Sequence, residues 1–338
     1  MSRHHNSHAV TIKDLAVAAG VSVMTVSRAL NGKSDVTDET RERIVELAKQ
    51  KGYIINGVAR DLRTRTTRVL GVIITDNSNP YFARVVRGIQ DTASQHGYSI
   101  ILSNTDEDPK REQQMVRLLQ EVRVAGLLLT PSFSNYDDII SLTQSGFPLV
   151  LINRHLEGID ASYVIGDDTK GAYLVTSHLI RRGFRRILFI NGPETISPAR
   201  DRMKGYQQAM AENGIRPEPE LIFNDNLTLD NGYTTMQHIL KSFPAPLGVL
   251  CFSDYVAIGA IKAIKEASFR IPEDVSIAGY DDVDVAAYLA SPLTTVKNPC
   301  YQIGQTATEL LIDIIEGRAE QKGHAIALEP ELVVRTSC

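Results

Sequence analysis

The chain has 338 residues, 43% hydrophobic and 22% charged, so it is long enough for more than one domain and can bury a full core. Its net charge of −4 is uneven: residues 1–68 hold 12 Lys and Arg against 7 Asp and Glu, and residues 69–338 hold the remaining 24 against 33. A basic N-terminal segment (the head, residues 1–68) in front of an acidic remainder (the body, residues 69–338) is typical of a protein whose head alone binds a polyanion. So short a segment can also reach this balance by chance.

The three cysteines are an odd number without CxxC spacing, which argues against a disulfide framework and predicts a reducing compartment. The N-terminus is polar and has no apolar signal segment, and the apolar runs are too short to span a bilayer. We therefore predict a cytoplasmic protein with no membrane partner. His4, His5 and His8 are interpreted as part of a polar tail, and no metal or cofactor site is predicted.

Residues 11–53 predict three short helices, each with one buried apolar stripe. Each helix starts after a hydroxyl residue suited to capping, and the first two end at residues that favour a left-handed turn. The expected caps are Thr11, Ser22 and Thr37, and the expected stops are Gly20 and Asn31-Gly32. Two capped helices joined by a tight turn form a helix-turn-helix, whose second helix enters the major groove of DNA with its N-terminal residues first.

The expected second helix, which runs to Leu30, carries side chains suited to DNA. Val23 and Met24 stand at its front, where apolar side chains contact thymine methyl groups and exclude water. Arg28, one turn further on, is placed to reach a guanine or a phosphate. The hydroxyl donors for phosphate oxygens are Ser22, Thr25 and Ser27. The alternative is a plain three-helix bundle with a solvated arginine, which an exposed Val-Met pair at a helix start fits poorly.

From residue 69 onward, short apolar strands alternate with amphipathic helices, a pattern typical of parallel sheets covered on both faces. The expected strands are Val69–Thr75, Tyr98–Ser103, Ala125–Thr130, Pro148–Ile152, Arg186–Ile190, Leu247–Phe252 and Val275–Gly279. The expected helices include Pro80–His96, Pro109–Val124, Thr169–Arg182, Arg200–Asn213, Asp254–Ala267 and Cys300–Glu316. The β-α-β unit occurs twice, which predicts an α/β fold with two doubly wound parallel-sheet lobes behind the all-α head. Ligands of such sheets bind at the carboxyl ends of the strands.

Recognition of a small polar ligand needs charged side chains that pair with its polar groups, and an apolar wall. Residues of these types lie at strand ends and helix starts: Tyr81 and Phe82 for the wall, and Arg154, Arg202, Ser253, Asp254 and Asp281 for polar contacts, with Asp167 a weaker candidate. Because a guanidinium pairs equally well with carboxylate or phosphate, a sugar acid, a sugar phosphate and a purine stay open as ligands. Each charge also has the alternative role of a solvated group or a structural ion pair.

The head motif Val21-Ser-Val-Met-Thr25-Val-Ser27-Arg28 resembles the headpiece of the LacI/GalR family of bacterial repressors, and Asn56-Gly-Val-Ala-Arg60-Asp-Leu62-Arg resembles its hinge helix. The resemblance implies that Val23 and Met24 set operator preference and that Leu62 wedges into the minor groove. Ile55 departs from the family, where proline commonly precedes the asparagine, so the start of the hinge helix is less fixed. We place the DNA contacts at Thr11, Ser22, Val23, Met24, Thr25, Ser27, Arg28, Asn31, Asn56, Arg60 and Leu62.

The resemblance continues through the body, for example in Asn79-Pro-Tyr-Phe82 and Arg200-Asp-Arg202-Met-Lys-Gly205-Tyr. The body is thereby similar to periplasmic sugar-binding proteins, in which the chain crosses between two lobes three times. The resemblance implies that Arg202 and Asp281 are the main residues pairing with the ligand. It also implies a homodimeric repressor on a pseudo-palindromic operator, controlled by a small sugar-like effector.

The expected domains are a helix-turn-helix domain over residues 1–55, a hinge helix and linker over 56–68, and an effector-binding and dimerisation domain over 69–338. Its N-lobe is placed at about 69–166 and 298–326, and its C-lobe at about 167–297 and 327–338.

Three other functions compete with this interpretation. An enzyme is disfavoured because the motifs GxxxxGK[ST], HExxH and GxSxG are missing and no GxGxxG follows the first strand. A transport-binding protein is opposed by the DNA-reading head and by the missing signal segment. A repressor whose sensor responds to a protein co-effector stays open.

Overall fold

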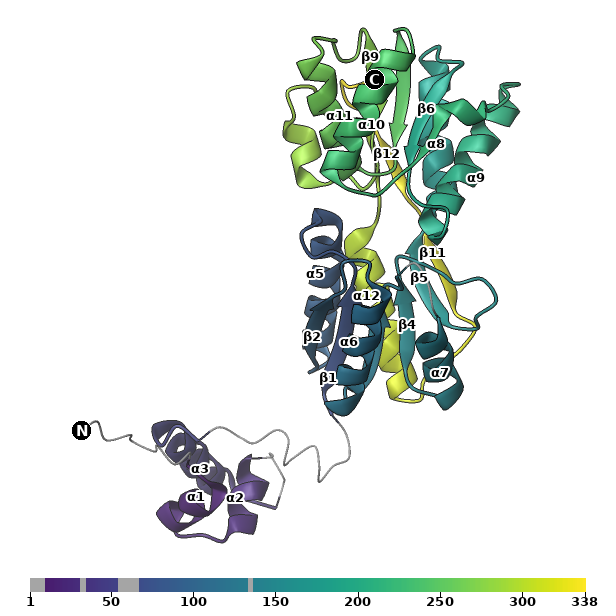
Figure 1. Cartoon of the computed structure of the whole chain (residues 1–338). Coiled ribbons are helices and arrows are strands. Elements are labelled where there is room, and N and C mark those ends of the chain that lie inside the picture. The colour runs from purple at the N-terminus through teal and green to yellow at the C-terminus, as the bar shows by residue number, and fades with distance from the viewer. Residues whose placement is uncertain (1–9, 31–34, 54–66, 133–135) are drawn as a thin grey trace, which may run out of the picture. The chain divides into compact units, whose positions relative to one another are not determined.

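The computed structural model describes residues 10–30, 35–53, 67–132 and 136–338. The chain divides into two compact units between residues 66 and 67 (Figure 1). The first is an all-α head, and the second is an α/β body.

The head consists of α1 (Ile12–Ala19), α2 (Val23–Leu30) and α3 (Asp38–Gln50). The predicted cap at Thr11 is confirmed as a capping box with Asp14, and Gly20 ends α1 in the left-handed conformation at φ 66°. The Ser22 hydroxyl accepts the amide of Thr25 at 3.0 Å, so the start of α2 is also capped as expected.

The three helices close over a small apolar core whose centre is formed by Leu15, Val26 and Ile44, one from each helix and all fully buried. Thr37 caps α3 through the amide of Thr40. Tyr53 packs against this core from beyond the end of α3. The expected stop at Asn31-Gly32 lies outside the described residues.

The N-lobe of the body has a six-stranded sheet in the order β11-β5-β4-β3-β1-β2, with all neighbours parallel. Its strands are β1 (Val69–Ile74), β2 (Ser99–Asn104), β3 (Gly126–Leu129), β4 (Leu149–Ile152), β5 (Ser162–Gly166) and β11 (Ala325–Leu328). Its helices are α5 (Pro80–Gln95), α6 (Pro109–Glu121), α7 (Asp137–Ser145) and α12 (Cys300–Ile315).

Alternation along β1 explains why helices cover both faces of this sheet. Leu70, Val72 and Ile74 pack with α5 and α12 in one apolar cluster. Ile73, which points to the other face, packs with α6 and α7. Successive side chains of a strand point to opposite faces, so a strand apolar at every position needs a layer on each side.

The C-lobe repeats this plan with a four-stranded parallel sheet in the order β7-β6-β8-β9. Its strands are β6 (Ile187–Asn191), β7 (Ile222–Asn224), β8 (Leu247–Cys251) and β9 (Val275–Ala278). Its helices are α8 (Asp168–Arg181), α9 (Ser197–Glu212), α10 (Leu229–Ser242) and α11 (Asp254–Glu266), with the short 3₁₀ turns η1 (Pro219–Leu221) and η2 (Asp284–Tyr288). Helices α10 and α11 pack on one face of the sheet, and α8 and α9 on the other.

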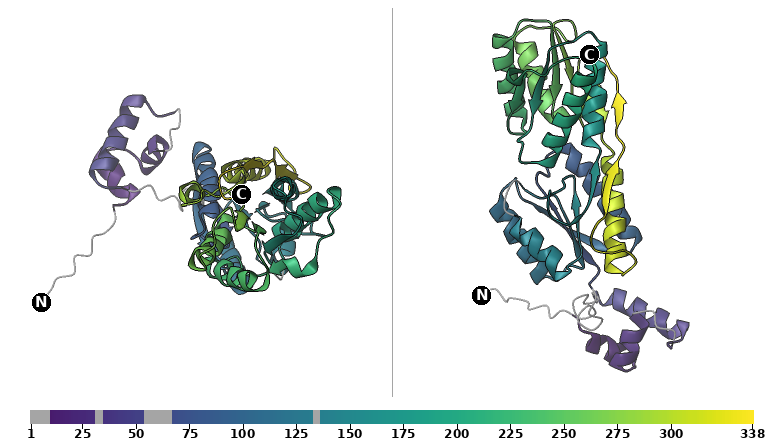
Figure 2. Two further views of the ribbon diagram at one scale, coloured as in Figure 1. Left: turned by 90° about the horizontal axis from the view of Figure 1, so that it is seen from above. Right: turned by 90° about the vertical axis from the view of Figure 1, so that its right-hand side faces the viewer.

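Within residues 136–338, the chain crosses between the lobes three times, as expected: from β5 to α8, from β10 (Thr295–Lys297) to α12, and from β11 to β12 (Glu331–Val333). Strands β10 and β12 form an antiparallel pair beside α8. The yellow C-terminal segment therefore runs along one side of the body from one lobe to the other (Figure 2).

The predicted strands are all present, each with ends within one residue of expectation. Helix α9 differs more: it begins at Ser197, three residues before the expected Arg200, because Pro198 stabilises its first turn. The boundary expected between the lobes at about residue 326 falls inside β11, which stays in the N-lobe sheet up to Leu328.

Candidate DNA interface and ligand cavity

The outer edge of α2 presents two apolar side chains. Val23 is 42% exposed and Met24 63% exposed, while Val26 and Ala29 on the inner side are buried. The Ser22 and Thr25 hydroxyls lie 2.9 Å apart at the start of the helix. The helix thus offers solvent the apolar pair that was predicted to face bases.

Arg28 is exposed but already has a partner. Its guanidinium forms an ion pair with Asp35 at 2.7 Å, and both side chains are about half exposed, at 52% and 48%. Asp35 therefore competes with DNA for the charge of Arg28, and opening such an exposed pair costs about 0–1 kcal/mol. No sequence pattern indicated Asp35.

The remaining expected DNA contacts divide into two groups. Thr11 is exposed and caps α1, while Ser27 is half-buried in α2. Four others lie outside the described residues: Asn31, Asn56, Arg60 and Leu62. The histidine tail, with His4, His5 and His8, lies outside them as well.

A cavity of about 550 Å³ opens between the two lobes of the body. It is lined by six of the seven predicted effector contacts, which are Tyr81, Phe82, Arg154, Arg202, Ser253 and Asp281. Its other lining residues are Thr75, Asp76, Asn79, Asp106, Glu107, Asn153, Ile196, Pro198, Asn226, Leu227, Thr228, Asn231 and Phe252. The cavity thus combines carboxylates and amides with an apolar wall, as a hydroxyl-rich ligand requires.

Asp281 offers the cavity a buried carboxylate. It is 5% exposed, and its Oδ1 has no hydrogen-bond partner among the residues described. Burial raises its pKa to about 7, although the positive charge of Arg202 acts in the opposite direction. An unsatisfied buried oxygen is costly unless a ligand completes its bonds.

Arg202 is held in one orientation on several sides. Its Nε donates to Asp168 at 2.8 Å, and its Nη1 donates to the carbonyl of Phe252. The guanidinium carbon lies 4.1 Å from the ring centre of Phe252 and 3.7 Å from that of Tyr280. Its Nη2 is 3.9 Å from Asp281 Oδ1, too far for a direct hydrogen bond, so a ligand hydroxyl in the cavity could bond to both groups at once.

Arg154 and Tyr81 are fixed from the N-lobe side. Arg154 donates to both carboxylate oxygens of Glu107, at 2.9 and 2.5 Å, and to the carbonyl of Pro131 at 2.7 Å. The Tyr81 hydroxyl donates to Asn153 at 2.6 Å. The positive charge of Arg154 is therefore already matched by a carboxylate.

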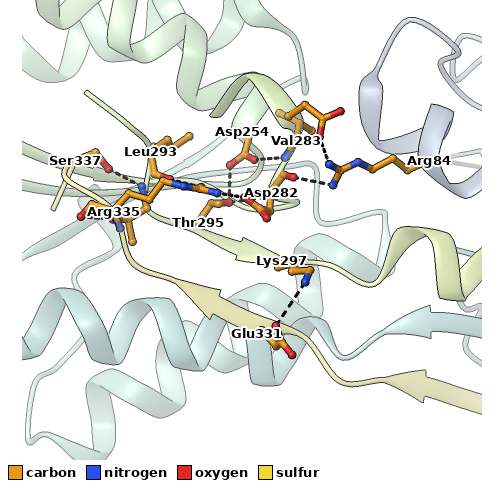
Figure 3. A network of polar contacts seen from close by, with 12 residues as sticks. Arg84, Asp254, Asp282, Val283, Leu293, Thr295, Lys297, Glu331, Arg335 and Ser337 are labelled. Atoms are coloured by element: carbon orange, nitrogen blue, oxygen red, sulfur yellow. Dashed lines mark hydrogen bonds and ion pairs between the residues drawn. The ribbon is translucent and has the colours of Figure 1, made fainter. Parts of the chain in front are cut away.

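Asp254 does not reach the cavity, so its predicted role as a ligand contact is corrected. It is fully buried, and its carboxylate accepts the Thr295 hydroxyl at 2.6 Å and the Val283 amide at 2.8 Å. Burial, followed by repulsion from Asp281, raises its pKa well above the usual range. Asp254 thus supports the turn at Asp282 and Val283, which directly follows Asp281 in the chain (Figure 3). Asp167, the weaker candidate, caps α8 and is likewise absent from the cavity lining.

Three amide side chains of the cavity were not predicted from the sequence: Asn153, Asn226 and Asn231. Asn226 comes from the segment between β7 and α10, and Asn231 from the first turn of α10, a part of the chain that carries no strong sequence signal. Asn153 stands directly before the predicted Arg154, in the left-handed conformation at φ 65°, and its strand-end position was the one available signal.

The head and body each match known proteins. Residues 11–56 match the bacterial regulatory proteins of the lacI family, and residues 176–338 match the periplasmic binding protein-like domain. The ribose operon repressor of Haemophilus influenzae is 36% identical over 327 residues, covering 97% of this chain and 98% of that protein.

The chain belongs to the LacI family. A second relative in the family, the HTH-type transcriptional repressor PurR of Aliivibrio salmonicida, is 31% identical and covers 97% of this chain and 98% of that protein. A crystal structure of the Lac repressor dimer bound to operator and the anti-inducer ONPF matches with a TM-score of 0.87 at 27% identity, covering 98% of this chain and 99% of that one.

Family membership makes the chain a DNA-binding transcriptional repressor with a ligand-binding sensor domain. Its relatives are regulators rather than enzymes. Within the described ranges, no helix is both long and apolar enough to cross a membrane.

Proposed function

We propose that the chain is an operator-binding homodimeric repressor whose effector is an uncharged, hydroxyl-rich sugar bound between the lobes. Residues 1–55 read DNA, residues 56–68 form the hinge, and residues 69–338 sense the ligand and dimerise. The proposal that the ligand is uncharged depends on one observation, the charge balance of the cavity. Arg154 and Arg202 are each matched by a carboxylate from their own lobe, Glu107 and Asp168.

This balance disfavours the anionic ligands that the sequence left open. The positive charges of these two arginines are already compensated, so they would not neutralise a sugar acid or a sugar phosphate. The carboxylate of Asp281, which lines the same cavity, would also repel an anionic ligand. A neutral sugar instead donates hydroxyl protons to Asp281 and accepts bonds from Arg202. The ribose operon repressor among the relatives supports a sugar, although its name describes that protein alone.

A thermal-shift screen of the full chain tests the ligand class, because a ligand that binds only the folded state raises the melting temperature. The panel contains D-ribose, D-glucose, cellobiose, ribose 5-phosphate, gluconate and hypoxanthine. We expect a neutral sugar to stabilise the chain and the same sugar to fail with Asp281→Ala. Stabilisation by the phosphate, the acid or the purine alone contradicts the proposal.

Selection of binding sites from a random DNA duplex library tests the operator function. We expect a palindromic consensus, because a two-fold symmetric dimer reads two half-sites. Exchanging Val23 and Met24 for Ala should change the preferred bases while leaving the half-site spacing the same. A library that yields no preferred palindrome, with or without sugar, contradicts this assignment.

A further inference from the structure

Helix α5 contributes both to the cavity wall and to a contact across the lobes. Its first turn supplies Tyr81 and Phe82 to the cavity. Arg84 lies one turn beyond Tyr81 and extends to the C-lobe (Figure 3). Its Nη1 donates to the carbonyl of Asp282 at 2.8 Å, and its Nη2 pairs with the carboxylate of Asp284. Arg84 is therefore a direct polar bridge between the lobes.

The C-lobe end of this bridge is the turn that carries the cavity carboxylate. Asp281 and Asp282 are both left-handed, at φ 106° and 53°, a conformation that costs energy for residues other than glycine. The turn is fixed from within its own lobe by Arg335, which donates to the Asp282 carboxylate at 2.6 Å and to the Leu293 carbonyl at 2.7 Å. Arg84 thus holds a rigid turn rather than a loose loop.

A ligand between the Tyr81–Phe82 wall and Asp281 joins the same two segments that Arg84 joins in its absence. We propose that Arg84 is a positioning residue of the ligand response, which holds the lobes together through Asp282 and Asp284 and so sets the ligand affinity. This role rests on the proposed function. Apparent affinity falls with the fraction of molecules in the binding-competent arrangement, so losing the bridge weakens binding without removing a ligand contact.

A second contact between the lobes determines how large the effect can be. The backbone amide of His155 donates to the Ser197 hydroxyl at 2.9 Å, and its ring Nε2 lies 2.8 Å from the Asp201 carboxylate. This contact stays in place when Arg84 is changed. We therefore expect substitution of Arg84 to shift the population of closed molecules and not to abolish closure.

The same helix provides a matched control. Arg87 is also an ion-paired arginine on the surface of α5, but its partner is Asp91 of the same helix, at 2.9 Å. Arg84→Ala and Arg87→Ala each remove one guanidinium from α5. Only the first removes a bridge between the lobes.

Single-molecule energy transfer on the ligand-free full chain measures lobe separation directly. Dyes are attached through Gln120→Cys on α6 and Lys265→Cys on α11, both exposed, while the native cysteines are buried. Arg84→Ala should move molecules to lower transfer efficiency, and Arg87→Ala should match the unsubstituted chain. An unchanged distribution for Arg84→Ala, or an equal shift for both variants, overturns the proposal.

Calorimetric titration with whichever compound stabilises the chain in the thermal screen gives the second readout. We expect Arg84→Ala to raise the Kd about two- to fivefold, the range for losing one partly exposed ion pair. The Arg87→Ala chain should keep the original Kd, and an equal Kd for all three proteins overturns the proposal. If no panel compound binds, the proposed ligand class fails, whereas the energy-transfer comparison still decides the role of Arg84.

Discussion

At the scale of single residues, the ion pair between Arg28 and Asp35 links the recognition helix to the segment before α3. The two side chains are 2.7 Å apart and half exposed, so the pair competes with any DNA contact that Arg28 makes. The interaction of Arg28 with Asp35 weakens its interaction with DNA. Substitution of Asp35 is therefore expected to strengthen operator binding.

We expect Asp35→Asn to raise operator affinity by up to about fivefold, because freeing Arg28 removes a competing pair worth about 0–1 kcal/mol. Fluorescence anisotropy with a labelled operator duplex measures the change. Asp38→Asn is the control, since Asp38 pairs with Arg41 inside α3. Weaker binding by Asp35→Asn shows that the pair positions Arg28 for DNA instead of withholding it.

As a proposed ligand contact, Asp281 predicts that ligand binding depends on pH. Burial raises the pKa of its carboxyl to about 7, so in the free protein it is protonated below that pH and ionised above it. Its contribution to folding stability falls as the pH rises from about 4 towards 7, because the folded state binds a proton that the unfolded state has released.

We expect ligand affinity to increase as the pH rises from 6 to 8, because an ionised carboxylate accepts more hydroxyl protons than a neutral acid. Titration calorimetry in two buffers of different ionisation enthalpy should detect proton release on binding near pH 6. Asp281→Asn should bind more weakly and lose the pH dependence. A wild-type affinity that is constant from pH 6 to 8 contradicts the assignment.

At the scale of elements, helix α9 owes its position to close packing on α8. A Cβ on Gly205 falls 2.0 Å from the Thr169 carbonyl oxygen and 2.8 Å from the Tyr173 amide nitrogen, both backbone atoms that cannot give way alone. The two helices must therefore separate to admit any side chain here. Since α9 carries Arg202, their packing also positions the ligand site.

We expect Gly205→Ala to destabilise the body by about 1–3 kcal/mol, because the overpacking outweighs the better helix propensity of alanine. Thermal unfolding of the full chain measures the loss, and ligand affinity should fall with it. Gln207→Ala, an exposed change on the same helix, is the control. A melting temperature for Gly205→Ala equal to that of the control contradicts the packing account.

The sequence predicted the elements that carry their own periodicity better than those that depend on distant partners. Strands such as β1 and β8 are continuous apolar runs, so their ends were placed within a residue. Strands β10, β11 and β12 are short and mixed in character: β11 forms beside β5, and β10 and β12 form beside each other, so each depends on a strand that is distant in the sequence. Residue spacing does not contain that information.

The cavity shows the same division between local and tertiary information. Strand ends and helix starts indicated Arg154, Arg202 and Asp281, because parallel strands deliver such residues to one edge. The same rule gave Asp254, which is turned away from the cavity by its bonds to Thr295 and Val283. Only the tertiary contacts show that Asp254 supports a turn, whereas Asp281 lines the cavity.

At the scale of the whole molecule, no strand among the described residues pairs with the outer edge of β2 in the N-lobe sheet. Strand β2 is the terminal strand, and Ile101 and Leu102 are 39% and 42% exposed on it. Open edges with apolar side chains are normally covered by another chain or protected by charge. A second copy of this chain is the expected cover in a homodimer.

We expect a combined Ile101→Glu and Leu102→Glu variant to weaken dimerisation at least tenfold, because like charges then meet across the two-fold interface. Sedimentation velocity measures the dimer fraction, and operator binding should fall with it because a monomer reads one half-site. The exposed pair Leu118→Glu and Val122→Glu, at the end of α6 and directly after it, is the control. If the β2 variant sediments in the same way as the unsubstituted chain, this edge is not part of the dimer interface.

The interlaced path of the chain dictates an order of events during synthesis. Strand β11 completes the N-lobe sheet beside β5, and β12 pairs with β10 in the C-lobe, although both come after α12. Neither lobe has its full set of strands until residues 325–333 have left the ribosome, whereas the head is complete hundreds of residues earlier. A message cut short within the last helix therefore produces a folded DNA reader attached to an unfinished sensor, a fragment that no effector can control.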